Sequence, residues 1–507
     1  MDAGSTFILK GARVIDPALG IDRITDIAVA DGRIKSVGEA DVAPSAPAID
    51  LEGLCLSPGW IDIHVHVYGT LGFAKPDSIG VYQGVTSFIE AGGPGFGTLD
   101  QFVALLDGQT ATRLYAGPLA EAMGLIGLNF EEKDARTLGD LSISKCLDFV
   151  QQHPGLLRYL KANAHGYGGP GPLKISKGLA EVLELPWYVH VGEFQNTTPN
   201  PPLAFEAFRL AEAGDIITHI FHNNLGRITD NEGRLLPVVR EAERRGVLFD
   251  LGFGAYNFSW TVAESAFAQG LVPHIISSDL QQFNVTGPTY SLANVMSVML
   301  RLGLNLAEVV ERVTSSPAKA LALSDRAGAL KPGAPADITV FRLEQGQFEL
   351  ADTSRQRRTA DTRIVPVMAF VAGTRFDCDL SICQDEENWL MQVVEDRIPS
   401  AADDLSEPQL EFLAALAVAL RRIDWDLPSP QLDLAKATEL QDAFHGVRRQ
   451  QRIALADALR AVYKCFLDRP FMMQIGLFII RLDRAFALCR LEEVAGRVAA
   501  RPRRVVA

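Results

Sequence analysis

Two histidines one residue apart, His64 and His66, are the residues of this sequence with the clearest chemical potential. They stand near the end of the apolar run SPGWIDIHVHV, residues 57–67, which begins with a Ser-Pro-Gly turn signal. The alternation in this run predicts a buried strand on which both histidines point to the same side. Neutral imidazoles are common ligands of divalent metals, so the pair could hold such an ion. Two histidines packed in a core would fit the same pattern, and partners elsewhere in the chain decide between the two interpretations.

Four further polar residues extend the pattern, because each one ends or closely follows a predicted strand. They are Lys161, His190, His219 and Asp279. The first three are 29 residues apart, and the last follows after 60, a gap that skips one strand near residue 250. A strand–helix unit of about 30 residues gives this spacing and places each residue at the C-terminal rim of a barrel, where barrel enzymes carry their chemistry. The set therefore predicts a metal centre rather than core histidines.

The elements that must position these residues lie between about residues 58 and 325. Helical patterns such as Leu203–Ala213 and Leu235–Arg245 alternate there with eight short β-type runs. Eight strand–helix units in this length predict an α/β fold, a (β/α)8 TIM barrel. The predicted strands are Ile61–Val67, Val85–Glu90, Arg113–Pro118, Arg158–Ala162, Trp187–Val191, Ile216–His219, Val247–Leu251 and His274–Ser278.

The barrel is flanked by segments of a different character. Residues 1–57 and 326–382 carry short strands separated by Gly, Asp and Pro, which predicts one small β-sandwich domain formed by both flanks. Residues 385–507 carry helical periodicity and few β-type runs, so we expect a helical C-terminal domain. This last part shows no catalytic motif. We interpret it as a packing or oligomerisation module and expect a homo-oligomer.

Composition restricts the partners and the compartment. Hydrophobic residues make up 48% of the chain and the formal net charge is −14, which indicates a globular protein and disfavours nucleic acid as a partner. The longest late apolar run, Phe471–Ile480, is too short to cross a membrane, and the N-terminus predicts no signal peptide. The six cysteines form no CxxC pair, which indicates a reducing compartment. We therefore expect a cytoplasmic protein that acts on a small molecule, without nucleic-acid or membrane partners.

The arrangement resembles the amidohydrolase superfamily. The shared features are Pro-Gly-x-Ile-Asp-x-His-x-His on the first strand, a lysine after strand four, histidines after strands five and six, and an aspartate after strand eight. The resemblance covers about residues 7–377. The lysine is similar to that of the binuclear type, and residues 218–221 and 276–280 resemble the deacetylase-like branch, which is related to dihydroorotases and D-aminoacylases.

This resemblance implies a ligand set and a reaction. The histidines of the first strand would bind one divalent ion, and those after strands five and six would bind a second. Lys161, carboxylated by carbon dioxide, would bridge both ions, while Asp279 would bind the first ion and act as the catalytic base. Zinc is the default metal, with nickel, manganese and iron left open. The implied ligands are His64, His66, Lys161, His190, His219 and Asp279.

The implied function is that of a metal-dependent hydrolase of the deacylase or deacetylase kind. Two cations would lower the pKa of the bridging water toward 7, and the resulting hydroxide would cleave an amide or ester bond of a small molecule. The alternatives are a cyclic amidase of the dihydroorotase or hydantoinase kind, or a metal-bound scaffold without activity whose helical part is an interaction module. Lys161 could also form a plain salt bridge, which would leave one ion, and His222 could replace His219. Candidate substrate contacts are His165, His222, Asn223, Tyr256 and Asn257.

Overall fold

The structure is a computed structural model that describes most of the chain. The described residues are 5–38, 45–68, 76–106, 110–121, 124–125, 143–164, 170–192, 202–282, 284–384, 393–425, 434–468 and 475–496. The chain divides into two compact units. The first comprises Met1–Tyr68, Gly72–Gly124 and Leu138–Asn388, and the second comprises Gly69–Leu71, Leu125–Thr137 and Trp389–Ala507.

A seven-stranded parallel sheet occupies the middle of the first unit. Its strands run in the order β12-β11-β10-β9-β8-β7-β6, so each lies beside its neighbours in the sequence. Nearly all of their residues are buried, as in parallel sheets that are covered on both faces. The strands are β6 (Trp60–Val65), β7 (Val85–Gly95), β8 (Arg113–Leu119), β9 (Leu160–Asn163), β10 (Trp187–His190), β11 (Ile216–Thr218) and β12 (Leu248–Phe249).

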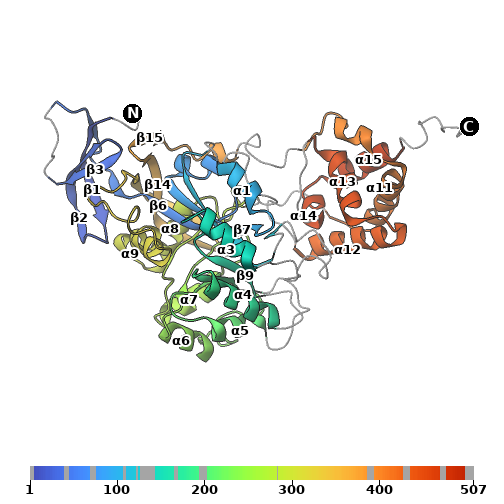
Figure 1. Cartoon of the computed structure of the whole chain (residues 1–507), viewed down its shortest axis with the longest axis horizontal. Coiled ribbons are helices and arrows are strands. Elements are labelled where there is room, and N and C mark those ends of the chain that lie inside the picture. Colours follow the sequence, from blue (N-terminus) through green and yellow to red (C-terminus); the bar gives the residue numbers. More distant parts are fainter. Residues whose placement is uncertain are drawn as a thin grey trace, which may run out of the picture. The chain divides into compact units, whose positions relative to one another are not determined.

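Helices alternate with these strands along the chain and lie around the sheet (Figure 1). Local sequence explains several helix ends: α9 begins with a capping box of Asn305 and Glu308, and α8 ends at Gly303, whose φ is 113°. The alternation confirms the prediction of a mixed α/β fold. The helices are α1 (Leu99–Leu106), α3 (Ile143–Gln152), α4 (Gly171–Val182), α5 (Leu203–Leu210), α6 (Pro237–Arg244), α7 (Trp260–Ala268), α8 (Leu292–Leu302), α9 (Leu306–Val313) and α10 (Ser315–Ala320).

The segment 274–280 pairs with both edges of the parallel sheet. On one side Leu251 N donates to Ile275 O at 3.1 Å, and on the other His66 N donates to Leu280 O at 2.9 Å. The prediction of a regular strand at His274–Ser278 is wrong, because only isolated bridges form there. The segment is irregular at Asp279, whose φ of 49° departs from extended backbone.

The segments before and after the predicted barrel both contribute to a second, eight-stranded sheet. The order is β15-β14-β13-β5-β1-β2-β3, with β4 paired to β1, and Phe7, Val14, Leu56 and Phe370 lie in its core. All eight strands belong to one hydrogen-bonded sheet, and their description as a sandwich stays a prediction. The strands are β1 (Phe7–Asp16), β2 (Ile21–Ala30), β3 (Arg33–Val37), β4 (Ala48–Asp50), β5 (Cys55–Pro58), β13 (Ile338–Ala351), β14 (Arg357–Val371) and β15 (Thr374–Asp377).

A bidentate ion pair joins the parallel sheet to the second sheet. Arg113, at the start of β8, contacts Asp337 through Nε–Oδ2 at 2.6 Å and Nη2–Oδ1 at 3.0 Å. The Asp337 side chain is 4% exposed and that of Arg113 is 31% exposed. We expect Arg113→Ala to lower the free energy of unfolding by about 1–3 kcal/mol, because a buried carboxylate loses its cation while the arginine side was partly solvated.

Urea unfolding followed by circular dichroism would measure this loss. The matched control is Arg13→Ala, which breaks another bidentate ion pair, between Arg13 and Asp22. The side chains of Arg13 and Asp22 are 45% and 41% exposed. Exposed pairs contribute about 0–1 kcal/mol, so this control should shift the midpoint less. Equal shifts for the two variants would contradict the importance of the Arg113 contact.

The second unit is helical in its described residues. Its helices are α11 (Glu407–Leu420), α12 (Leu434–Gln451), α13 (Leu455–Phe466), α14 (Ile475–Ile479) and α15 (Arg484–Ala495). Aromatic rings of Phe412, Phe444, Phe466 and Phe478 pack in its core. Across the described part of the chain, no helix combines the length and the apolar character that crossing a membrane requires.

Candidate metal centre

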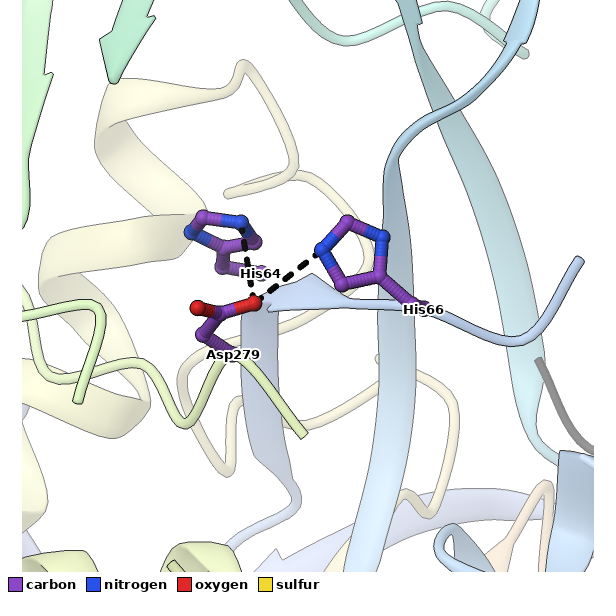
Figure 2. A group of neighbouring side chains, drawn as sticks. All are labelled: His64, His66 and Asp279. Carbon is purple, nitrogen blue, oxygen red and sulfur yellow. Dashed lines mark ion pairs between the residues drawn. The ribbon is translucent and has the colours of Figure 1, made fainter. Parts of the chain in front are cut away.

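Three predicted ligands converge at the C-terminal end of the parallel sheet. His64 and His66 come from the end of β6, and Asp279 comes from the segment that pairs beside it. His66 Nε2 lies 3.0 Å and His64 Nε2 lies 3.5 Å from Asp279 Oδ1 (Figure 2). All three side chains are buried, and their ligand atoms lie within 4.8 Å of one another. Two imidazole nitrogens and a carboxylate oxygen in this arrangement suit a divalent transition metal.

The local backbone explains how Asp279 reaches the histidines. Its N–H donates to the carbonyl oxygen of His64 at 2.7 Å, which fixes the segment against β6. Asp279 and His219 both have positive φ values, 49° and 67°, which cost about 1–3 kcal/mol each in residues other than glycine. Gly254 lies against the carboxylate, because a β-carbon at this position would collide with Asp279 Oδ2. Such strain and close approach are typical of a functional site.

Lys161 reaches the same cluster from β9. Its Nζ lies 2.8 Å from His64 Nε2 and donates to the carbonyl oxygen of Ala91 at 2.9 Å. The side chain is buried, and this burial lowers the pKa of Lys161 to about 8. The structure thus brings Lys161 into contact with one of the two histidines of the first strand, although the two residues are 97 positions apart.

His190 and His219 lie next to this group through their rings. The ring centroids are 4.3 Å apart for His190 and His219, and 5.0 Å apart for His64 and His219. One nitrogen of each ring faces a backbone carbonyl: His219 Nδ1 lies 2.6 Å from Gly252 O, and His190 Nε2 lies 3.3 Å from Gly192 O. The six predicted ligands therefore lie in one place in the structure.

Comparison with known proteins shows the family. The profile of a family described as a deacetylase-like composite domain matches residues 330–377. A deacetylase of Agrobacterium fabrum is 32% identical over 365 residues, which span 69% of this chain and 88% of that protein. The chain belongs to the amidohydrolase superfamily. A deacetylase of Enterococcus faecalis is 30% identical over 69% of this amidohydrolase and 95% of its own length.

Solved structures agree with this assignment. The crystal structure of a dihydroorotase has a TM-score of 0.67 and 30% sequence identity to this amidohydrolase, and the match covers 74% of this chain and 98% of the other. The chain is thus a hydrolytic enzyme of the superfamily, of which metal binding is a trait. The sequence-based resemblance to the deacetylase and dihydroorotase branch is confirmed.

The buried environment sets the protonation states of the cluster. Burial, followed by the charge of Lys161, lowers the pKa of His64 well below its usual value, and burial lowers that of His219 to about 4. Burial alone would raise the pKa of Asp279, but contact with His66 and the charges of His219 and Lys161 lower it overall. Burial alone would lower the pKa of His66, but its contacts with Asp279 and Glu90 raise it overall, so a bound cation would have to displace the proton of His66. The neutral imidazoles of His64 and His219 beside the ionised Asp279 are the forms that a cation requires, so the residues fit a metal in this amidohydrolase.

Two buried carboxylates that the sequence interpretation missed hold the first strand in place. Glu90, in β7, accepts hydrogen bonds from the N–H groups of Val67, Tyr68 and Gly93 at 2.5, 2.9 and 2.9 Å. Its Oε1 also lies 3.4 Å from His66 Nδ1. The only signal in the sequence is its place near the end of the second predicted strand.

The second of these carboxylates, Asp62, belongs to the His-x-His motif itself. It accepts from Ser278 N at 3.1 Å, from Ser278 Oγ at 2.5 Å and from His64 N at 3.2 Å. Burial raises its pKa to about 7. The contact to Ser278 ties the first strand to the segment that carries Asp279.

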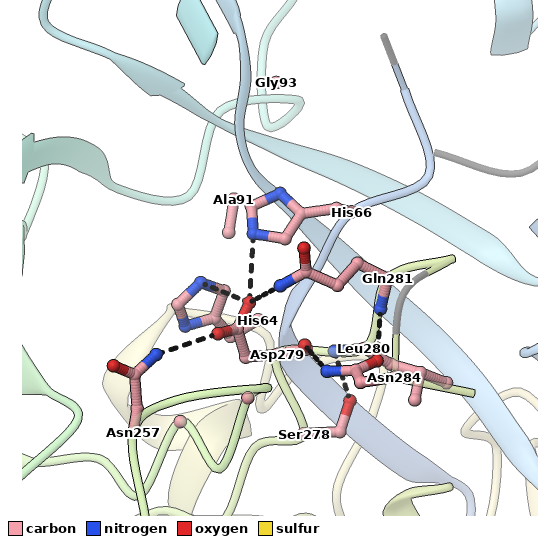
Figure 3. A network of polar contacts seen from close by, with 12 residues as sticks. His64, His66, Ala91, Gly93, Asn257, Ser278, Asp279, Leu280, Gln281 and Asn284 are labelled. Atoms are coloured by element: carbon pink, nitrogen blue, oxygen red, sulfur yellow. Dashed lines mark hydrogen bonds and ion pairs between the residues drawn. The ribbon is translucent and has the colours of Figure 1, made fainter. Parts of the chain in front are cut away.

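The predicted substrate contacts of the amidohydrolase lie in different environments. Asn257 lies at the cluster, where its Nδ2 donates to Asp279 Oδ2 at 3.3 Å (Figure 3). His222 is buried and its Nδ1 accepts from Asn224 N at 3.0 Å, while Asn223 is exposed and Tyr256 is half-buried. His165 lies outside the described residues. The ring contacts of His219 with His64 and His190 favour it over His222 as a ligand.

Proposed function

We propose that this amidohydrolase is a deacylase that hydrolyses an amide or ester bond of a small molecule with the help of two divalent metal ions. The observation that carries the proposal is the meeting of His64, His66 and Asp279 with Lys161, whose Nζ lies 2.8 Å from His64 Nε2. The deacetylase relatives support the acyl-transfer reaction. We further propose that the parallel sheet and the segment 274–280 form a closed (β/α)8 barrel, since that segment bonds to both sheet edges.

The residues of the cluster fit two ions with a bridging group between them. His64, His66 and Asp279 would hold one ion, and His190 and His219 the second. We propose that Lys161 is carboxylated, because a plain ammonium cannot bind a cation and a carbamate carries two ligand oxygens. Zinc suits both imidazole nitrogen and carboxylate oxygen. When bound, the ions would lower the pKa of a water ligand and polarise the substrate carbonyl.

Asp279 is the group that would move the proton. Its Oδ1 faces the two histidines of β6, while its Oδ2 is contacted only loosely by Asn257 Nδ2 at 3.3 Å. One oxygen can therefore serve the metal while the other accepts a proton from the attacking water. The same carboxyl group would then deliver that proton to the departing nitrogen or oxygen.

A cyclic amidase is the second candidate. The dihydroorotase structure that matches this chain at 30% identity and a TM-score of 0.67 supports it. Both reactions attack a carbonyl carbon and expel a nitrogen or, for an ester, an oxygen, so the same cluster could perform either one. The substrate distinguishes them.

Metal analysis and a substrate screen would test the proposal. Purified protein would be analysed for bound metals and assayed with N-acyl amino acids, acetyl esters and cyclic ureides. We expect stoichiometric divalent metal and turnover of an acyl substrate. Turnover of cyclic ureides alone would favour the cyclic amidase. Protein without bound metal, whose activity is unchanged by chelators, would contradict the metal-dependent reaction.

The remaining proposals come from the sequence. We propose that residues 1–57 and 326–382 form a β domain beside the barrel of residues 58–325, and that residues 385–507 are a module for assembly of a cytoplasmic homo-oligomer. The free cysteines among the described residues agree with the reducing compartment of this proposal. Light scattering of the full chain and of a chain ending at residue 384 would show whether the helical part sets the oligomeric state.

A further inference from the structure

A series of buried, hydrogen-bonded hydroxyl and carboxyl groups contacts the ring of His64. Tyr188, in β10, places its hydroxyl oxygen 2.9 Å from His64 Nδ1 and 2.6 Å from Asp250 Oδ2. Asp250 follows β12, and neither residue was singled out by the sequence. We propose that Tyr188 and Asp250 are positioning residues that hold the proton of His64 on Nδ1 and thereby keep Nε2 free to bind the metal. This inference rests on the metal-dependent function proposed above.

The donors and acceptors around His64 allow one assignment of its proton. In the metal-free protein, before the proposed carboxylation, the ammonium group of Lys161 can only donate hydrogen bonds. It lies 2.8 Å from Nε2, which must therefore accept. A neutral His64 then carries its proton on Nδ1. This N–H faces the hydroxyl oxygen of Tyr188 at 2.9 Å, while that of Thr218 is farther away at 3.4 Å. The Tyr188 hydroxyl must therefore direct its own proton elsewhere. Asp250 Oδ2, at 2.6 Å, is the acceptor that receives it.

In these contacts the Asp250 carboxylate accepts hydrogen bonds and donates none. Its Oδ2 receives three hydroxyl groups, from Tyr188 at 2.6 Å, Thr218 at 2.6 Å and Ser277 at 2.7 Å. Its other oxygen, Oδ1, is buried and has no hydrogen-bond partner among the described residues. Burial raises the pKa of Asp250 to about 6, and the three short donors on one oxygen oppose this rise by favouring the ionised carboxylate. The direction of the contacts is therefore fixed from His64 through Tyr188 to Asp250.

The arrangement differs from that of the neighbouring histidine. His66 faces the carboxylate of Glu90 directly, with Nδ1 3.4 Å from Oε1, whereas His64 reaches its carboxylate through a tyrosine. Partners of the nitrogen that does not bind metal set the tautomer and the ring orientation of a histidine ligand, and their loss typically weakens metal binding 10–100-fold. Tyr188 and Asp250 should have this effect on the ion held by His64.

The test compares Tyr188→Phe with Tyr159→Phe. The two tyrosine rings are stacked, with centroids 4.3 Å apart, and both are fully buried. The Tyr159 hydroxyl, however, donates to the backbone carbonyl oxygen of Ile63 at 2.8 Å instead of facing the ring of His64. We expect Tyr188→Phe to raise the dissociation constant for zinc about 10–100-fold, measured by competition with a chelator, and Tyr159→Phe to leave it unchanged.

A second readout follows the proton itself. Nitrogen-15 spectra of the histidine-labelled, metal-free protein should show the Nδ1-protonated form of His64 in the wild type and a mixture of forms in Tyr188→Phe. If Tyr188→Phe does not fold, Asp250→Asn tests the same chain of contacts. A neutral partner lets the Tyr188 hydroxyl turn toward His64 Nδ1, which favours the wrong tautomer and should also weaken zinc binding.

The outcomes separate this inference from the proposed function. If the wild type binds zinc and a folded Tyr188→Phe or Asp250→Asn binds it equally tightly, the positioning role is overturned. Equal weakening by Tyr159→Phe would also overturn it, because the effect would then come from the tyrosine stack. If the wild type itself binds no metal but keeps the Nδ1-protonated form of His64, the metal-dependent function fails while the proton assignment stands.

Discussion

Asp279→Asn should lower kcat about 10²–10⁴-fold while the metal remains bound. The asparagine keeps an oxygen that can face His64 and His66, which lie 3.5 and 3.0 Å from Asp279 Oδ1. It cannot take up a proton at neutral pH, so the transfer from water to the leaving group loses its carrier. Steady-state kinetics and metal analysis on the same preparation would separate the two effects.

Asp16→Asn is the matched control for this variant. Asp16 is also a fully buried carboxylate, but it lies in the second sheet, where it accepts from Leu330 N at 2.6 Å and from Leu19 N at 3.1 Å. These two bonds go to different oxygens, of which an asparagine keeps only one, so the variant loses one hydrogen bond in the second sheet. The activity of the folded variant should not change. Wild-type turnover by Asp279→Asn would refute Asp279 as the proton carrier.

Lys161→Ala should remove one or both of the proposed metal ions. Lys161 lies between His64 Nε2 and the carbonyl oxygen of Ala91, at 2.8 and 2.9 Å, and an alanine side chain carries no group that could bridge two ions. Short carboxylates such as acetate or propionate should restore part of the metal and of the activity, because they supply the two oxygens that the carbamate would have provided. Elemental analysis with and without the additive measures this result.

Lys177→Ala controls for the loss of a lysine from the same unit. Its ammonium group lies on α4, 3.0 Å from Asp215 and 3.1 Å from Glu181, and only 12% of the side chain is exposed. This variant should retain the metal. Undiminished metal content in Lys161→Ala without any additive would favour the plain salt-bridge interpretation of Lys161 and a single ion.

The spacing of a repeated strand–helix unit made the candidate ligands predictable. Parallel strands in sequence order bring their C-terminal ends to one edge of the sheet, so His190 and His219 could be placed beside His64 from their positions alone. The same reasoning could not find Tyr188, which lies inside β10, or Asp250, since both act through contacts with residues 62 and 124 positions away. Periodicity does not encode which side chains meet across the interior of a sheet.

The limits of the sequence interpretation are clearest where the backbone is irregular. The positive φ of Asp279 interrupts the last predicted strand, and no residue pattern around Ser277 and Ser278 signals this turn. Asn223, a predicted substrate contact, is exposed. The oligomeric state, the cytoplasmic location and the role of the helical C-terminal part stay predictions.

The pairing of residues 274–280 with β6 has a consequence for the biogenesis of the enzyme. The N–H of Asp279 donates to His64 O, and the N–H of His66 donates to Leu280 O. Asp279 therefore meets His64 and His66 only when the first and last parts of the sheet have joined. His66 and Asp279 are more than two hundred residues apart in the sequence. A ribosome must therefore translate more than two hundred codons beyond the His-x-His motif before this cluster can form. We therefore expect the proposed metal ion to bind only after the first and last parts of the parallel sheet have joined.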